Sequence, residues 1–337
     1  MRTTNRRRSG EPRAKSRASN GVAVPATYQC DPVLWASWLY HHDELTQNQI
    51  ADLLGVSRAT VVNYLQQARA NHYIRVSVRS ELLSGIELAT QMKDAFGLAE
   101  CMVIPDDYGL RSPTERIGKA AAQFMDQTLA PGDVLGVAWG RTVLAVAENL
   151  ADRPVPNLTV VQVMGRQRSA YECSTAEECV SLISLKLHAH TANLHAPALL
   201  SVPKLRDDLL REPIIQEQFV RIRSCNKILF GICTIKKNSL VFSSGLTNPE
   251  ESKSFIANGA VGVITGRFFD AQGNWIKADM DDRLMGITLD EVRQIPTRIA
   301  VAGGPDKTDS ILGALRGGFA NVLITDEQTA RSILARL

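Results

Sequence analysis

Length, composition and charge exclude several classes of protein at the outset. The chain has 337 residues, of which 45% are apolar, and a formal net charge of +3, which is ordinary for a globular protein of two or three domains. No apolar run approaches the roughly 20 residues of a membrane-spanning helix, and no apolar signal core is visible. We therefore expect a cytoplasmic protein without membrane contact, whose six cysteines lack CxxC spacing and stay reduced.

The positive charge is concentrated near the start of the chain. Residues 1–78 carry ten basic and five acidic side chains, which gives this part a charge of +5 and leaves −2 for the rest. Residues 1–27 are rich in Arg, Ser, Asn and Pro and lack any apolar period, so we predict a disordered basic tail. This tail is either a loose phosphate-binding arm or an extension without a role. The basic part indicates a polyanionic partner.

A DNA-reading motif is the strongest signal in the first part. Asp31-Pro32 is typical of a helix start, and Leu34, Trp35, Trp38 and Leu39 are expected on the inner face of that helix. The stretch "LTQNQIADLLGVSRATVVNYLQQA" then places Ala51, Gly55 and Val61 at the spacing of a helix-turn-helix. Thr46 and Ser57 precede the two helices as caps, and Gly55 suits a left-handed turn. We predict a helix-turn-helix domain over residues 28–80, winged-helix-like because Tyr73–Val78 alternates like a strand.

The outer face of the second helix is polar and has no acidic residue. Arg, Asn and Gln can make paired hydrogen bonds to base edges in the major groove. The side chains expected there are Ser57, Arg58, Ala59, Thr60, Asn63 and Gln66. Thr46 and Gln47 are expected to bind backbone phosphate of double-stranded operator DNA. The alternative is an ordinary helical hairpin with a polar surface.

The rest of the chain has the pattern of an α/β protein. Residues 81–97 predict a linker helix with Leu82, Ile86, Ala89, Met92 and Phe96 on one face, which could also pair with a second copy. Over residues 98–337, short apolar runs alternate with amphipathic helical stretches, which is typical of a Rossmann-like, largely parallel sheet. The runs are "CMVI", "DVLGVAW", "LTVVQVMG", "NKILFGIC", "AVGVITG", "TRIAVAGG" and "NVLIT". We expect this domain to bind an effector and to form oligomers.

Glycines and basic residues follow several of these runs. Ligands bind at the carboxyl ends of parallel strands, and a helix that starts there favours an anion. The candidate effector-binding residues are Gly140, Arg141, Thr142, Gly165, Arg166, His195, Asp282, Gly303, Gly304 and Lys307. Each has a plainer explanation: the glycines suit tight strand-to-helix links, His195 can be structural, and Asp282 can pair with Arg283 on the surface.

The chain shows no convincing catalytic set, cofactor motif or metal site. GxSxG, HExxH and Walker sequences are all missing from it. Lys307 could form a Schiff base with an aldehyde sugar if burial lowered its pKa, but a phosphate-binding lysine is the simpler interpretation.

Together these segments resemble the SorC-type (SorC/DeoR) bacterial transcriptional regulators. The resemblance covers about residues 30–337 and rests on the helix-turn-helix stretch, "GVAWGRT", "VVQVMG", "NLHAPA", "GRFFDAQG", "DDRLMGITLDEVRQIP" and "AGGPDKTDSILGALRGGFANVLITDE". It implies an effector domain similar to sugar-phosphate isomerases but without their activity, a tetramer, and effectors that are sugars, polyols or their phosphates. It also implies that Gly140, Arg141 and Thr142 form a phosphate-side loop and that Gly303, Gly304 and Lys307 form the opposite wall. Asp281 and Asp282 match an acidic motif that is structural or effector-binding.

Three positions depart from the family pattern. Val263 stands where many relatives have an acidic residue, and Arg166 and Cys233 stand where glycine is common. The sequence thus predicts a DNA-binding regulator of a carbohydrate or polyol operon, controlled by such an effector. The alternatives are an active sugar-phosphate isomerase or deaminase fused to a DNA-binding module, and a regulator whose pocket binds nothing.

Overall fold

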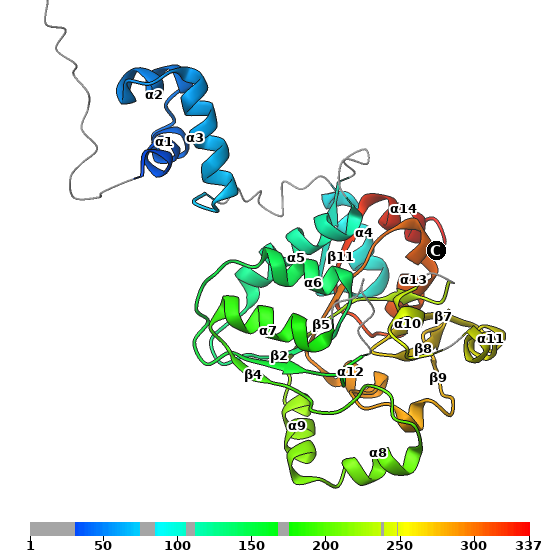
Figure 1. The fold of residues 1–337 in the computed structure, drawn as a ribbon. Helices are drawn as coiled ribbons and strands as arrows, with labels where there is room; N and C mark the ends of the chain where they lie inside the picture. The colour runs from blue at the N-terminus through cyan, green and yellow to red at the C-terminus, as the bar shows by residue number, and fades with distance from the viewer. Residues whose placement is uncertain (1–30, 75–84, 106–111, 168–174, 237–238, 248) are drawn as a thin grey trace, which may run out of the picture. The chain divides into compact units, whose positions relative to one another are not determined.

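The computed structural model describes residues 31–74, 85–105, 112–167, 175–236, 239–247 and 249–337. The predicted tail over residues 1–27, and most of the strand predicted at Tyr73–Val78, lie outside these residues. The chain divides into two compact units, which comprise the described parts of residues 1–77 and 78–337 (Figure 1). Each unit is considered by itself.

The first unit is a bundle of three helices, α1 (Pro32–His41), α2 (Gln47–Leu54) and α3 (Arg58–Ala70). The predicted caps are confirmed: Asp31, Thr46 and Ser57 each accept a backbone N–H of the helix that follows. Gly55 ends α2 with φ of 65°, as a helix-turn-helix turn requires. Ala51 and Val61 are buried where the helices cross.

The predicted inner face of α1 is wrong at two positions. Leu34 and Trp38 are 41% and 50% exposed, and Trp38 stacks on His42. Val33 and Ala36 are buried instead, beside Leu39. The small side chain of Ala36 lets α1 pack closely on the bundle, so the helix is rotated relative to the face that its largest apolar residues favour.

The second unit is built around a parallel sheet. Among the described residues, seven strands pair in the order β1-β11-β10-β5-β2-β3-β4, and every pairing is parallel. The strands are β1 (Glu100–Ile104), β2 (Val134–Val137), β3 (Thr159–Gln162), β4 (His190–Ala192), β5 (Lys227–Phe230), β10 (Thr297–Val301) and β11 (Val322–Asp326). This confirms the predicted Rossmann-like parallel sheet.

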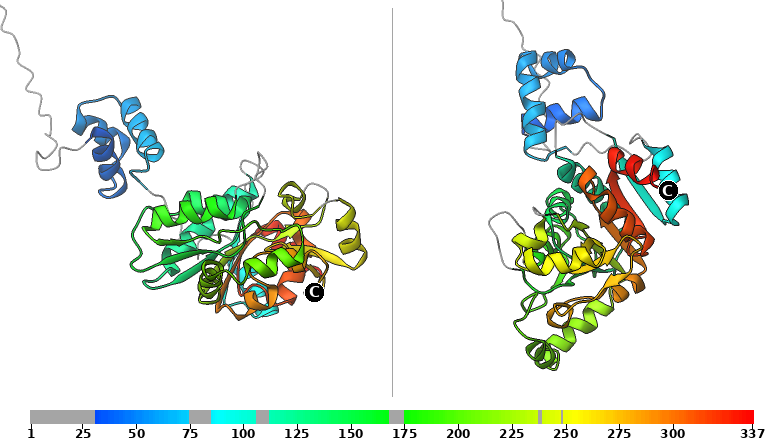
Figure 2. Two further views of the ribbon diagram at one scale, coloured as in Figure 1. Left: turned by 60° about the horizontal axis from the view of Figure 1, so that its bottom comes forward. Right: turned by 90° about the vertical axis from the view of Figure 1, so that its right-hand side faces the viewer.

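Helices cover both faces of this sheet (Figures 1 and 2). One face packs against α5 (Pro113–Thr128), α6 (Arg141–Asn149) and α7 (Ala176–Leu187). The other packs against α4 (Ile86–Phe96), α9 (Pro213–Arg223), α12 (Leu289–Gln294), α13 (Thr308–Arg316) and α14 (Glu327–Leu334). The apolar residues of each strand alternate between these two cores, so the sheet is buried on both sides.

A smaller antiparallel sheet lies beside the parallel one. Its order is β6-β7-β8-β9, with β6 (Cys233–Thr234), β7 (Ala260–Ile264), β8 (Arg267–Asp270) and β9 (Trp275–Ile276). The run "AVGVITG", which we expected in the parallel sheet, instead forms β7 of this antiparallel sheet. It turns directly into β8 through Thr265 and Gly266, both at positive φ, and a tight turn of this kind joins antiparallel strands. The remaining elements are α8 (Pro203–Leu209), α10 (Leu240–Ser243), α11 (Pro249–Ala257) and the 3-10 helices η2 (Asp281–Arg283) and η3 (Pro305–Lys307).

The expected linker helix packs onto the parallel sheet. Met92 of α4 is fully buried in the core that contains β1 and α14, while Ile86, expected on the buried face, is 58% exposed. α4 therefore packs within the second compact unit, which comprises the described parts of residues 78–337. Within the described residues, no helix combines the length and the apolar character needed to cross a bilayer.

The strand order reverses between β2 and β5. The chain runs outward from β2 through β3 to β4, then returns to β5 and proceeds through β10 to β11 on the other side. At such a switch point the loops after neighbouring strands diverge and leave a crevice at the carboxyl end of the sheet.

Candidate functional site

The reader helices, α2 and α3, present a polar surface. Val61, Leu65 and Ala68 of α3 are buried against the bundle. The residues predicted to contact DNA lie on the open side: Thr46, Ser57, Arg58, Ala59, Asn63 and Gln66 are exposed, and Gln47 and Thr60 are half-buried. The polar face of α3 therefore points away from the core, which is the condition for entering a major groove.

Several of these side chains have local partners as well. Ser57 Oγ accepts the Thr60 N–H at 3.1 Å, and Thr46 forms a capping box with Gln49. Arg58 Nε donates to Gln47 Oε1 at 3.2 Å, which joins the first residues of the two helices. Thr46 and Ser57 thus shape the reader whatever else they contact.

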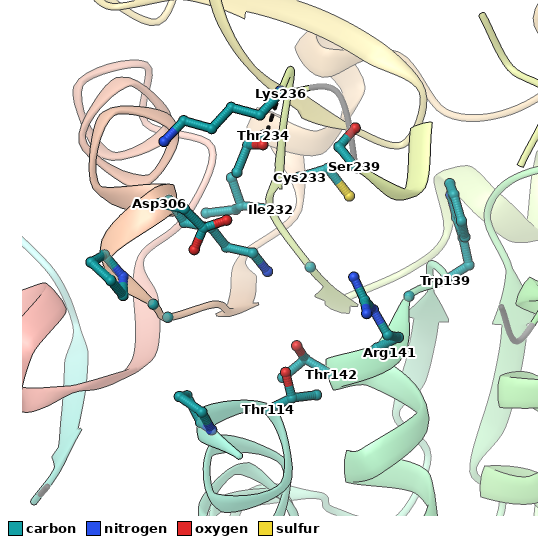
Figure 3. A pocket seen from close by; sticks show the side chains of 17 residues that line it. Thr114, Trp139, Arg141, Thr142, Ile232, Cys233, Thr234, Lys236, Ser239 and Asp306 are labelled. Carbon is teal, nitrogen blue, oxygen red and sulfur yellow. Dashed lines mark hydrogen bonds between the residues drawn. The ribbon is translucent and has the colours of Figure 1, made fainter. Parts of the chain in front are cut away.

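The second candidate site is a cavity of about 610 Å3 at the strand switch point, here called the effector cavity. The loops after β2, β5 and β10 meet there with the start of α5 (Figure 3). Its lining comprises Pro113, Thr114, Trp139, Gly140, Arg141, Thr142, Gly231, Ile232, Cys233, Thr234, Lys236, Ser239, Gly303, Gly304, Pro305, Asp306 and Lys307. Six of the ten predicted effector-binding residues are among them.

One wall is the start of α6. Gly140 precedes this helix with φ of 133° and gives no side-chain cap, so the first-turn N–H groups are left for a ligand. Arg141 is exposed and Thr142 is buried, and Figure 3 shows Arg141 rising from α6 into the space that faces Cys233 and Ser239. Free amides, the helix dipole and a guanidinium together favour an anion.

The opposite wall is the loop from Gly303 to Lys307. Gly304 N–H donates to Asp326 Oδ2 at 2.7 Å and to Thr329 Oγ1 at 2.8 Å, and both acceptors are buried. These bonds fix the loop at the carboxyl end of β10. Lys307 is half-buried at its end and adds a second positive charge to the cavity lining.

A third group of lining residues was missing from our predictions. Cys233, Thr234, Lys236 and Ser239 follow β5, and Thr114 lies in the first turn of α5. Glycine after the run "NKILF" was a usable signal, because it marks a strand end. Nothing in the sequence indicates that β5 lies beside β2, so this loop could not be distinguished from other strand-end loops.

The other four predicted effector-binding residues lie outside the effector cavity. Arg166 and His195 line a separate hollow of about 450 Å3 beyond β3 and β4, where Arg166 is 3.4 Å from Glu177. Gly165 is packed so tightly that an added Cβ would lie 2.6 Å from the Pro197 carbonyl oxygen. Asp282 is exposed on η2. The loop after β3 does not join the loop after β2 around the effector cavity, so the ten residues do not lie around one cavity.

Asp281, the neighbour of Asp282, has a structural role. Its Oδ1 accepts from the buried Arg267 at 2.8 Å and from Trp275 Nε1 at 3.2 Å. Burial lowers the pKa of the Arg267 guanidinium, and the Asp281 carboxylate opposes that shift. Val263, the first departure from the family pattern, is 2% exposed in an apolar cluster with Phe268, whereas Cys233 lines the effector cavity.

Comparisons with known proteins identify the family of the chain. A family model of a sugar-binding domain, named Sugar-bind, matches residues 80–335. The transcriptional regulator YjhU of Escherichia coli K12 is 38% identical over 90% of this chain and 94% of its own. The crystal structure of the full-length sorbitol operon regulator SorC from Klebsiella pneumoniae superposes with a TM-score of 0.77 at 27% identity, over 90% of this chain and 97% of that one. The chain belongs to the SorC family of transcriptional regulators with a sugar-binding domain.

Another relative of this SorC-family regulator is the deoxyribonucleoside regulator of Bacillus subtilis 168. It is 32% identical over 89% of this chain and 96% of its own. The resemblance noted from the sequence is thereby confirmed, as is the assignment of the chain as a DNA-binding transcriptional regulator. The family model of the sugar-binding domain covers nearly all of the second compact unit and none of the first.

Proposed function

We propose that this SorC-family regulator binds a small sugar, polyol or sugar phosphate in the effector cavity and that the ligand changes its affinity for operator DNA. One observation carries the proposal. Three strand-end loops converge at the switch point and line one cavity with Arg141, Lys236 and Lys307, at the open start of α6. Hydroxyl groups of Thr114, Thr234 and Ser239 line the same space (Figure 3). Positive charge beside hydroxyl groups suits a phosphorylated or otherwise anionic carbohydrate.

The names of the relatives support this ligand class. A sorbitol operon regulator and a deoxyribonucleoside regulator are similar to the chain over nearly its whole length. We infer that the genes it controls belong to the breakdown of a related sugar or polyol, in the cytoplasm. The reader helices bind the operator through Arg58, Asn63 and Gln66, with Thr46 at the phosphate backbone.

The regulator acts as an oligomer, which we infer to be a tetramer. Two reader units use two half-sites only if they lie about 34 Å apart or a multiple of that distance. A ligand changes operator affinity only if it binds the competent and incompetent arrangements with different affinities.

We further propose that the cavity binds its ligand without converting it. Sugar-phosphate isomerisation needs a positioned base, and Asp306 is the carboxylate residue among the described lining, at an exposed position. His195 lies in the separate hollow. An active isomerase or deaminase is the alternative, and it is distinguished by turnover.

A single ligand screen tests these proposals. The full chain is mixed with a panel of sugars, polyols and their phosphates, and both thermal unfolding and chemical conversion of each compound are recorded. Stabilisation by a compound that is recovered unchanged supports the proposal. Conversion of the compound supports the enzyme, and a panel without any stabilising member supports a regulator with a pocket that binds nothing.

A further inference from the structure

The hydrogen bond between Gln47 and Arg58 links the two reader helices at their first residues. Gln47 is the first residue of α2 and Arg58 is the first residue of α3. Arg58 Nε donates to Gln47 Oε1 at 3.2 Å, although the residues are 11 positions apart. Gln49, two residues after Gln47, has a different role, because its Oε1 accepts from Thr46 N at 2.9 Å in the capping box.

This bond leaves the reading end of Arg58 free. A guanidinium has five N–H donors, and using the one at Nε leaves the four on its two terminal nitrogens. Within the part of the chain that the structure describes, no carboxylate forms an ion pair with Arg58, which is exposed. The two terminal nitrogens form the fork that matches O6 and N7 of guanine.

The hydrogen-bond partner of Arg58 is a neutral amide, that of Gln47, rather than a carboxylate, and this difference matters for binding DNA. An exposed arginine loses rotamer entropy when it binds a partner, and a hydrogen bond at Nε reduces that loss because the side chain is already oriented. A carboxylate at position 47 would orient Arg58 equally well, but it would repel the phosphates on either side of the groove. Gln47 orients the guanidinium and leaves its charge uncompensated.

The surroundings of the pair leave room for a duplex. Gln47 and Arg58 line an open hollow of about 640 Å3 with Tyr40, Glu44, Leu45, Thr46 and Asn48. Glu44 is the acidic residue of this lining, and it makes no ion pair with Arg58 among the described residues. The guanidinium therefore has open space before it rather than protein.

We propose that Gln47 is a positioning residue for sequence recognition: it holds Arg58 so that the two terminal nitrogens read a guanine at one edge of each operator half-site. This rests on the proposed docking of α3 in the major groove. It differs from a phosphate contact by Gln47, which would add affinity without regard to sequence, and from a simple tie between the helices, which would add only stability.

The experiment uses the full chain and duplexes enriched from a random pool. At each guanine of the enriched half-site, Kd is measured with guanine, with adenine and with 7-deazaguanine, which lacks the N7 acceptor. The discrimination ratio is Kd with the substitute divided by Kd with guanine. We expect one guanine with a ratio of roughly tenfold or more in the unmodified chain, since a paired contact of this kind gives about 1–3 kcal/mol of discrimination.

Four variants separate the explanations. Arg58→Ala brings the ratio at that guanine close to one, and Gln47→Ala lowers it at least threefold at that position alone. Gln47→Ala combined with Arg58→Ala lowers it no further than Arg58→Ala. Gln47→Glu keeps the acceptor oxygen, so the ratio stays within twofold of the unmodified chain while affinity for every duplex falls. Gln67→Ala is the matched control, because Gln67 is exposed nine positions after Arg58, on the other side of α3.

Other results overturn the proposal in distinguishable ways. An equal loss of affinity for all duplexes in Gln47→Ala shows a phosphate contact, and a fall in unfolding temperature with an unchanged ratio shows a tie between helices. A ratio that is unaffected by Arg58→Ala removes Arg58 from base recognition. If the random pool yields no enriched site at all, the proposed docking of α3 falls, and this proposal falls with it.

Discussion

The geometry of the effector cavity requires a residue without a side chain at position 303, which is Gly303. A Cβ at this position would lie 2.1 Å from Asp326 Oδ2, which is the oxygen that accepts the Gly304 N–H. Asp326 is buried and also accepts from Thr329 N and Thr329 Oγ1. A methyl group at residue 303 therefore displaces the carboxylate that fixes the whole loop.

We expect Gly303→Ala to destabilise the second unit by about 1–3 kcal/mol, the typical cost of leaving buried hydrogen-bonding groups without partners. Urea unfolding measures the change. Gly231→Ala is the matched control, because a Cβ there would meet its nearest atom, the Val301 carbonyl oxygen, at an ordinary 3.8 Å. Equal stability of the two variants would contradict the role given to the Asp326 contact.

Arg141 and Lys307 stand on facing walls of the cavity. We expect Arg141→Ala and Lys307→Ala each to reduce the thermal stabilisation given by the effector, because each removes a charge that binds its anion. Operator affinity without effector should stay unchanged, since neither residue lies in the first unit. Arg211→Ala, at a 78% exposed side chain outside the cavity, is the control, and an undiminished response in both cavity variants would remove the site assignment.

At the scale of elements, the amino ends of β2 and β5 are joined by a charged pair. Asp133 accepts from Lys227 Nζ and Asn226 Nδ2, both at 2.9 Å, and from Ala130 N at 2.8 Å. Burial raises the pKa of the Asp133 carboxyl, but these hydrogen bonds and the Lys227 charge outweigh it and lower the pKa below its ordinary value. The pair thus holds together the two strands between which the effector cavity opens.

A carboxyl group whose pKa is lower in the folded state than in the unfolded state stabilises the fold at any pH above the unfolded-state pKa. This contribution to stability is lost as the pH falls through the folded-state pKa. We expect the stability of the second unit to decline from about pH 4 downward. Asp133→Asn should cost about 1–3 kcal/mol at pH 7 and show a flatter decline in acid. Urea unfolding across pH 2.5–7 measures both, and an equally steep acid decline in Asp133→Asn would assign the effect to other carboxylates.

At the scale of the whole molecule, two compact units with different chemistry must communicate. The first has a polar reader surface, and the second has a positively charged cavity. Any ligand effect on DNA binding therefore requires a coupling free energy, and typical couplings amount to about 1–3 kcal/mol.

We expect light scattering to give the mass of a tetramer, and a stabilising effector to change operator Kd by about 5- to 150-fold. Linkage makes the effect reciprocal, so operator DNA should change the effector Kd by the same factor. Fluorescence anisotropy of labelled operator and calorimetry of the effector measure the two factors. Unequal factors would show that a change in oligomeric state accompanies binding and must enter the coupling scheme.

Local chemistry allowed much of this regulator to be read from its sequence. The caps at Asp31, Thr46 and Ser57, the left-handed Gly55, and the buried Val61 all follow from interactions within a few residues of the chain. The same holds for six strands of the parallel sheet, because continuous apolar runs between amphipathic helices have few alternative structures. The start of α6 at Gly140 and the loop at Gly303 were predicted for the same reason.

Tertiary structure decided which strand ends share a cavity. The order in which parallel strands pair places the loop after β5 beside that after β2, and so adds Cys233, Thr234 and Lys236 to the effector cavity. It leaves Arg166 and His195 in a separate hollow, although their sequence context looked alike. Apolar periodicity likewise could not tell which side of α1 or α4 is covered, as Trp38 and Ile86 show. Local sequence determines whether a helix, strand or turn forms, whereas the neighbours of each element depend on contacts between distant residues, which no short stretch of chain encodes.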